Sequence, residues 1–392
     1  MQSDTPPHAP SGHHQNPYQD DRPLHPGQGP QEEPLEFVSL RPPSKDNYLL
    51  HFALFVATII TTTHAGLMYV STGGPSIWIG IIDLGPDVPL PLLFEPYTGF
   101  DPGGIALFEP WRGLYFSATL MFILLCHEMG HYVAARIHKV DVSLPYFIPL
   151  PFLGLGTFGA VISMREKIKN RNALMDIGAA GPLAGLVVTV PLLIYGLWLS
   201  DVNVVPLGSQ SMSEGNSIFY LGLKYLVKGE LLPWGGRDVF LHPIAWAAWC
   251  GLLVTMINLI PVWQLDGGHV AFAYFGSRYE WASRWFHKVL PAVGLSVVVY
   301  VFITSLYSVA PVASGVPPLW LNTWTDALTN AVSAGLPWFI WPALLLFMLR
   351  RSGGRYHPPV DAEPLSRGRR AVGLLVMILF VLIFMPIPLR VG

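Results

Sequence analysis

The chain has 392 residues, of which 52% are hydrophobic and 12% are charged. A soluble domain carries roughly a quarter charged residues, so this composition indicates a protein surrounded by lipid. The formal net charge of -2 leaves no bulk electrostatic case for a nucleic-acid partner. The two cysteines, Cys126 and Cys250, both lie in apolar runs, which argues against a disulfide framework.

The first 46 residues are rich in proline, glutamine, histidine and glycine. A segment of this composition cannot bury enough apolar surface to offset the entropy of ordering, so we expect a disordered tail. Its histidines could bind metal loosely, but a solvated tail explains them better. We expect residues 47–392 to form one membrane-embedded domain.

Seven apolar stretches follow, each close to the ~20 residues that span a bilayer. They cover residues 49–70, 114–135, 173–199, 243–262, 289–308, 331–349 and 371–389. Prolines in the fourth and sixth stretches leave their ends and kinks open. Residues 74–100 are apolar but interrupted, which favours an interfacial or re-entrant segment. The predicted fold class is an all-α polytopic membrane protein with about seven transmembrane helices.

Basic residues concentrate in alternate loops. Loops 136–172, 263–288 and 350–370 are rich in lysine and arginine, loop 71–113 holds only Arg112, and loop 309–330 holds none. Loop 200–242 is neutral on this point. Because positive charge favours the cytoplasmic side, we expect a cytoplasmic N-terminus and an external C-terminus.

The second stretch contains His127-Glu128-Met129-Gly130-His131. On a helix, residues four apart share one face, so both imidazoles can reach one metal ion. Zinc lowers the pKa of a bound water to about 7, and Glu128 can then take its proton. The alternative is a span end with interfacial histidines and a snorkelling glutamate. It is disfavoured because three ionisable side chains at membrane depth are costly.

A catalytic zinc needs a third protein ligand beside one open position. The best candidate is Asp266, which follows Pro261 at the predicted cytoplasmic end of the fourth stretch. The second stretch runs toward the same face, so the two segments meet at one depth. Pro261 ends regular helix, and Gly267-Gly268 permits a tight turn that aims the carboxylate into the bundle. The alternative is a helix-capping aspartate.

These two segments together resemble the site-2 protease family of intramembrane zinc metalloproteases. That family pairs H-E-x-G-H with a later N-x-x-P-x-x-x-L-D-G, matched here by His127–His131 and Asn258–Gly267. The resemblance covers a core of about residues 110–275. It implies Zn²⁺ held by His127, His131 and Asp266, Glu128 as catalytic base, and Asn258 positioning the substrate or the oxyanion. No segment suits a PDZ or CBS domain, as in the compact branch that includes plant plastid members.

Residues 144–164 are apolar but rich in proline and glycine, so they cannot form a regular helix. Non-helical backbone at membrane depth is tolerated where it lines a cavity. We therefore predict a re-entrant, partly β loop beside the active site. Its exposed edge, around Gly156, Phe158 and Gly159, would hold an extended substrate by β-augmentation. The alternative is a structural loop that simply packs on the bundle.

Glycines recur at positions 178, 181 and 185 of the third stretch. They fall on neighbouring helical positions, and small residues let helices approach closely. We interpret this glycine face as packing, against the second or fourth stretch, rather than as chemistry.

The predicted function is an intramembrane zinc metalloprotease acting in or near transmembrane segments. By resemblance, its substrate is a single-span membrane protein such as an anti-sigma factor or a tethered regulator, in a bacterial inner membrane. One rival is a membrane-anchored zinc protease with a cytosolic site, for which Glu166 is the available third ligand. Other rivals are a non-catalytic transporter or scaffold, and a zinc site without activity.

Overall fold

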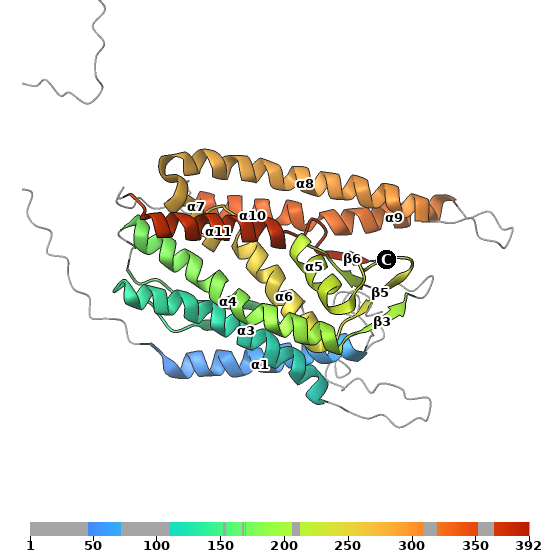
Figure 1. Cartoon of the computed structure of the whole chain (residues 1–392), viewed down its shortest axis with the longest axis horizontal. Coiled ribbons are helices and arrows are strands. Elements are labelled where there is room, and N and C mark those ends of the chain that lie inside the picture. The colour runs from blue at the N-terminus through green and yellow to red at the C-terminus, as the bar shows by residue number, and fades with distance from the viewer. Residues whose placement is uncertain are drawn as a thin grey trace, which may run out of the picture. The chain divides into compact units, whose positions relative to one another are not determined.

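The computed structural model describes residues 46–71, 110–151, 154–166, 168, 170–205, 212–308, 320–351 and 364–391. The predicted tail up to residue 45 and the predicted interfacial segment 74–100 lie outside the described residues. All described residues belong to the unit Lys45–Gly392. They are mostly helical (Figure 1).

Five helical segments among the described residues are long and apolar enough to cross a membrane. They are α1 (Tyr48–Ser71), α3 (Pro110–Ile137), α4 (Arg171–Leu199), α8 (Tyr279–Ser308), and the consecutive helices α9 (Trp320–Gly335) and α10 (Pro337–Arg351) taken together. They match the first, second, third, fifth and sixth predicted stretches. The break between α9 and α10 comes next to Pro337, which cannot continue the hydrogen-bonding ladder of α9.

The other two predicted stretches form shorter helices. Helix α6 (Pro243–Asn258) has 16 residues, and α11 (Arg367–Ile383) has 17 residues. At 1.5 Å per residue each is about 25 Å long, a few ångströms less than the ~30 Å hydrocarbon core. Length and composition therefore support five of the seven predicted spans.

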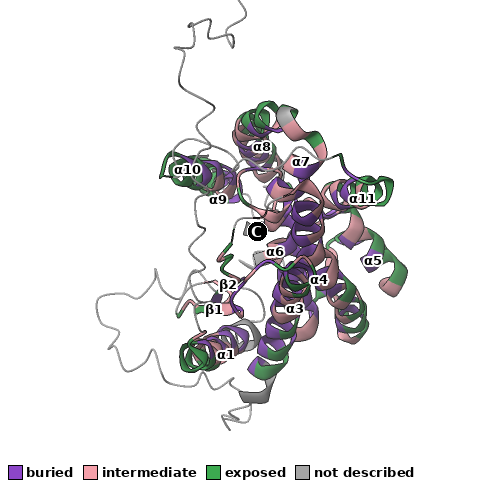
Figure 2. Ribbon diagram, turned by 90° about the vertical axis from the view of Figure 1, so that its left-hand side faces the viewer, coloured by how far each residue is buried: buried purple, intermediate pink, exposed green. Residues whose placement is uncertain are grey.

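Helices α3, α4 and α6 pack against one another, and α1 packs on α3. Figure 2 shows buried residues concentrated where these helices meet. The apolar windows of α3 and α4 are 56% and 50% buried, whereas that of α8 is 22% buried. A Cβ at Gly130 would lie 2.4 Å from the Ala180 carbonyl oxygen, so α3 and α4 approach as closely as glycine allows. The second predicted stretch is thus an interior helix.

The loop between α3 and α4 contains an antiparallel hairpin of β1 (Tyr146–Pro149) and β2 (Thr157–Val161). Tyr146 pairs with Val161, and a register shift follows Phe147. The predicted β character of this loop is confirmed. The turn between the strands includes residues 152 and 153, which lie outside the described residues.

Two further ribbons correct the prediction of a purely helical domain apart from that loop. Strand β3 (Asp201–Val204) pairs with β5 (Arg237–Phe240), and β4 (Met212–Glu214) pairs with β6 (Leu389–Val391). Each strand has three or four residues. Such strands are too short to show a period-two pattern. In addition, β4 and β6, which pair with each other, are distant in the sequence.

A buried ion cluster stabilises the region around β4. Lys224 of α5 (Ile218–Lys228) is fully buried, with its ammonium 2.7 Å from Glu214 and 3.5 Å from Asp238. The Tyr220 hydroxyl donates a hydrogen bond of 3.0 Å to Glu214. Burial raises the pKa of Glu214, and the Lys224 ammonium opposes that shift. Lys224 therefore compensates the carboxylate on the strand that pairs with β6.

Replacing Lys224 by methionine should lower stability strongly, because it leaves a buried carboxylate unpaired, a change that costs on the order of 3–5 kcal/mol. The loss should grow as the pH rises, since the raised folded-state pKa of Glu214 favours the protonated form. The measurement is the melting temperature of the full chain in detergent between pH 5 and 8. Arg237→Met, which breaks an exposed 2.9 Å pair with Glu230, is the control and should change little. Equal effects of the two variants would contradict the prediction.

Candidate metal centre

Two histidines and a glutamate lie on the buried part of α3. His127, Glu128 and His131 are 4%, 6% and 6% exposed. The four-residue spacing brings the Nε2 atoms of His127 and His131 to 3.2 Å. Helix α3 therefore delivers two imidazole nitrogens to one point, as the sequence predicts.

Asp266 is the first residue of α7 (Asp266–Phe275), a short helix that follows α6 through residues 259–265. The sequence predicted a tight turn at Gly267-Gly268, but both glycines lie in the first helical turn. A Cβ on Gly267 would lie 2.0 Å from the Leu259 carbonyl oxygen, and one on Gly268 2.2 Å from the Trp263 carbonyl oxygen. The glycines thus let the preceding loop fold onto the start of α7. A carboxylate at this end of a helix is also favoured by the helix dipole.

The three side chains fit one zinc ion. Asp266 Oδ2 lies 3.1 Å from His127 Nε2, and Asp266 Oδ1 lies 3.3 Å from His131 Nε2. Tetrahedral zinc with ligand distances of about 2.0–2.1 Å separates its ligand atoms by about 3.3 Å. His131 Nδ1 donates 2.7 Å to the Ile177 carbonyl oxygen, which leaves the Nε2 lone pair for a metal. In the described part of the chain, these are the residues grouped closely enough to hold an ion.

The glycine face of α4 packs directly on these side chains. A Cβ on Gly181 would lie 2.0 Å from His131 Nε2, and one on Gly185 would lie 3.2 Å from His127 Nδ1. A Cβ on Gly178 would lie 2.9 Å from the Cβ of His269 on α7. The sequence predicted packing against the second or fourth stretch. The structure places the glycines beside the ligands themselves on α3 and beside α7, a role that spacing alone could not assign.

A cavity of about 600 Å³ opens onto the metal centre. His127, Glu128 and Asp266 line it, together with Asn258, whose Nδ2 lies 3.5 Å from His127 Nε2. The structure thus brings Asn258 to the site. Glu166, the alternative third ligand, is exposed at the cavity and is not part of the group that could hold an ion.

The predicted substrate residues do not line this cavity. Gly156 packs on α1, where the Thr61 hydroxyl donates 2.6 Å to its carbonyl oxygen. Phe158 is 64% exposed, and the space beside Gly159 is open. The cavity is lined instead by the next residues of the chain, from Ala160 at the end of β2 to Glu166. The Ile162 backbone lies close to the Glu128 carboxyl group.

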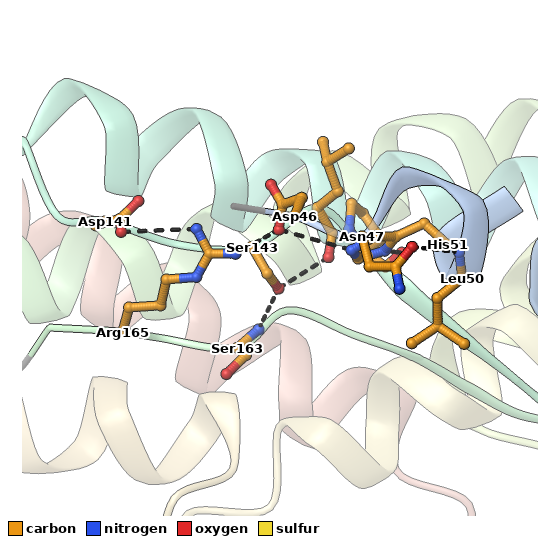
Figure 3. Close-up of polar contacts among 10 residues, drawn as sticks. Asp46, Asn47, Leu50, His51, Asp141, Ser143, Ser163 and Arg165 are labelled. Carbon is orange, nitrogen blue, oxygen red and sulfur yellow. Dashed lines mark hydrogen bonds and ion pairs between the residues drawn. The ribbon is translucent and has the colours of Figure 1, made fainter. Parts of the chain in front are cut away.

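Polar contacts fix the base of the hairpin (Figure 3). Arg165 pairs with Asp46, just before α1, and lies 3.6 Å from Asp141, just after α3. The Ser163 amide donates 2.9 Å to the Ser143 hydroxyl. His51 of α1 donates through Nδ1 to the Pro145 carbonyl oxygen at 3.0 Å. Both strands of the hairpin are therefore tied to the start of α1 and the end of α3.

Residues 115–301 match the family model described as peptidase family M50. The match includes His127, His131, Asn258 and Asp266, the residues that meet at the cavity. The chain carries a peptidase family M50 domain. The resemblance to site-2 proteases is thus confirmed.

Curated relatives of this chain have related names. It is 32% identical over 221 residues to "Probable zinc metalloprotease EGY1, chloroplastic" of Arabidopsis thaliana, covering 54% of this chain and 39% of the relative. It is 30% identical over 246 residues to "Probable zinc metalloprotease EGY2, chloroplastic" of Oryza sativa subsp. indica, covering 60% of this chain and 42% of the relative. The chain thus spans about two fifths of these relatives. Their names agree with the predicted enzyme class and zinc cofactor.

The M50 match and the five apolar helices identify an integral membrane protein. These relatives are named chloroplastic, and their names do not support the predicted bacterial inner membrane.

Replacing Gly181 by alanine should weaken zinc binding at least tenfold, because the new methyl group would occupy the place of the His131 ring. The measurement is zinc affinity by chelator competition. The control is Gly222→Ala on α5, where a Cβ meets nothing within 4 Å and alanine favours the helix. If Gly181→Ala bound zinc as tightly as Gly222→Ala, the close packing of α4 on His131 would not matter for the site.

Proposed function

We propose that this M50 protein is an intramembrane zinc metalloprotease that hydrolyses peptide bonds in or near transmembrane segments of membrane proteins. The observation that carries the proposal is the meeting of His127, His131 and Asp266 within 4.8 Å of one another. Two of these residues lie on a helix long and apolar enough to span a membrane. The ion, when bound, supplies Lewis acidity that activates water and polarises a carbonyl group.

Glu128 is the proposed general base. It follows the first ligand on α3 and lines the same cavity as Asp266. Its carboxylate takes a proton from the attacking water and later delivers it to the leaving nitrogen. Asn258 Nδ2 lies at the edge of the ligand group, where it can donate a hydrogen bond to the substrate or to the oxyanion.

The β hairpin is the proposed substrate platform. A peptide carbonyl inside an intact helix is hydrogen-bonded and shielded, so a protease must bind an unwound, extended strand. Within the described residues, β2 pairs with β1 alone, which leaves its other edge for β-augmentation. The cavity lining from Ala160 onward places that strand's end beside Glu128. Gly156, Phe158 and Gly159 would then contact substrate residues farther from the scissile bond.

The proposed substrate is a single-span membrane protein, such as an anti-sigma factor or a tethered regulator, within the lipid bilayer. We also propose that α6 and α11 complete seven spans, with the β hairpin re-entrant and the N-terminus cytoplasmic. The basic loops support this orientation. A bacterial inner membrane remains the proposed location.

The central test is cleavage of single-span substrates by the purified chain in detergent. Glu128→Gln should lower kcat by about 10²–10⁴-fold, because the base is lost, while zinc stays bound. Zinc content measured on the same samples separates loss of the base from loss of the metal. Wild type that binds zinc but cleaves no candidate substrate, and zinc flux in vesicles that Glu128→Gln leaves unchanged, would favour a transporter instead.

A second test identifies the third ligand. Asp266→Asn should weaken zinc binding sharply, whereas Glu166→Gln should leave it unchanged, since only Asp266 belongs to the ligand group. Bound zinc per chain is the measurement. The opposite pattern would support the rival protease with a cytosolic site.

A further inference from the structure

Tyr279 connects both sides of the segment that carries Asp266. It is the first residue of α8 and is fully buried. Its hydroxyl donates 2.8 Å to the carbonyl oxygen of Trp263, three residues before Asp266. Its ring meets that of Phe272 on α7 edge-on, with ring centroids 5.4 Å apart. A single side chain therefore contacts the loop before α7 and the helix itself.

The backbone at Trp263 adopts a conformation that is intrinsically unfavourable for tryptophan. Its φ is 55°, in the left-handed region that large side chains disfavour. Lys139 is the other described non-glycine residue with positive φ, and it lies just after α3, where left-handed residues commonly end helices. Trp263 lies in the middle of a loop, so its conformation needs support from surrounding contacts.

Contacts with the Trp263 carbonyl group stabilise this backbone conformation. Its oxygen accepts the Tyr279 hydrogen bond and also packs against Gly268, where a Cβ would come within 2.2 Å. Gln264 and Leu265, the two residues between Trp263 and Asp266, line the active-site cavity. A rotation of the backbone at Trp263 would turn this carbonyl group away and displace the start of α7.

We propose that Tyr279 is a positioning residue: through the Trp263 carbonyl group it holds the loop that places the Asp266 carboxylate beside His127 and His131. The inference rests on the proposed metal site. Tyr279 lies outside both metal motifs and is not among the residues that line the active-site cavity.

The test uses the full chain in detergent, with zinc alone as the probe. Tyr279→Phe keeps the buried ring and removes only the hydroxyl, and it should weaken zinc binding about tenfold, the lower end of the effect of lost outer-shell partners. The absorption spectrum of the cobalt-substituted protein should also change, because the carboxylate moves relative to the imidazoles. Tyr220→Phe is the matched control: it removes another buried hydroxyl, bonded to Glu214, and should leave zinc affinity unchanged.

A double-variant comparison separates positioning from general loosening. Glycine tolerates positive φ, so in a Trp263→Gly background the loop needs less support and Tyr279→Phe should change zinc affinity by less than about twofold. A full tenfold loss in both backgrounds, a loss in Tyr220→Phe equal to that in Tyr279→Phe, or unchanged zinc affinity in Tyr279→Phe would each overturn the inference. Wild type that binds no zinc would overturn the proposed function as well. Zinc binding by wild type that is unchanged in Tyr279→Phe would overturn only this inference.

Discussion

Two imidazoles and a carboxylate in a lipid-embedded protein are stable only if each has a partner, and this constraint organises the structure. Isolated ionisable groups at membrane depth are costly, so they must meet one another or a metal ion. His127, His131 and Asp266 meet at 3.1–3.3 Å, and the Ile177 carbonyl group accepts the remaining hydrogen of His131. The close approach of α4 and the short helix α7 both serve this meeting.

A β hairpin lies beside the site, and under the proposed function it would bind the substrate as an extended strand. A helical lining would leave no backbone group free to bind an extended peptide, whereas a β edge presents free donors and acceptors. The hairpin is tied to α1 by His51 and Thr61 and at its base by Arg165. Its position relative to Glu128 therefore depends on how α1 packs on α3.

Several features could not be predicted from sequence because they depend on distant contacts. The glycine face of α4 was visible as a spacing, but only the packing of α4 on α3 shows that Gly181 adjoins His131. The cavity lining begins at Ala160, just beyond the predicted Gly156 and Phe158, because the register of the hairpin decides which residues reach Glu128. The β4–β6 ribbon joins segments far apart in the chain, and no local pattern could pair them.

The sequence by itself determined the membrane setting and the helical pair of histidines with Glu128, because composition and a four-residue helical spacing are local properties. It also predicted Asp266 as their partner, because the second and fourth apolar stretches bring the two motifs to the same membrane face. The tertiary structure decided how Asp266 arrives, at the start of a short helix under a folded-back loop rather than in a glycine turn. It also decided which neighbours hold that loop, including the Tyr279 hydroxyl on Trp263. Those contacts join residues that are brought together only by the packing of α6, α7 and α8, and a linear pattern carries no record of that packing.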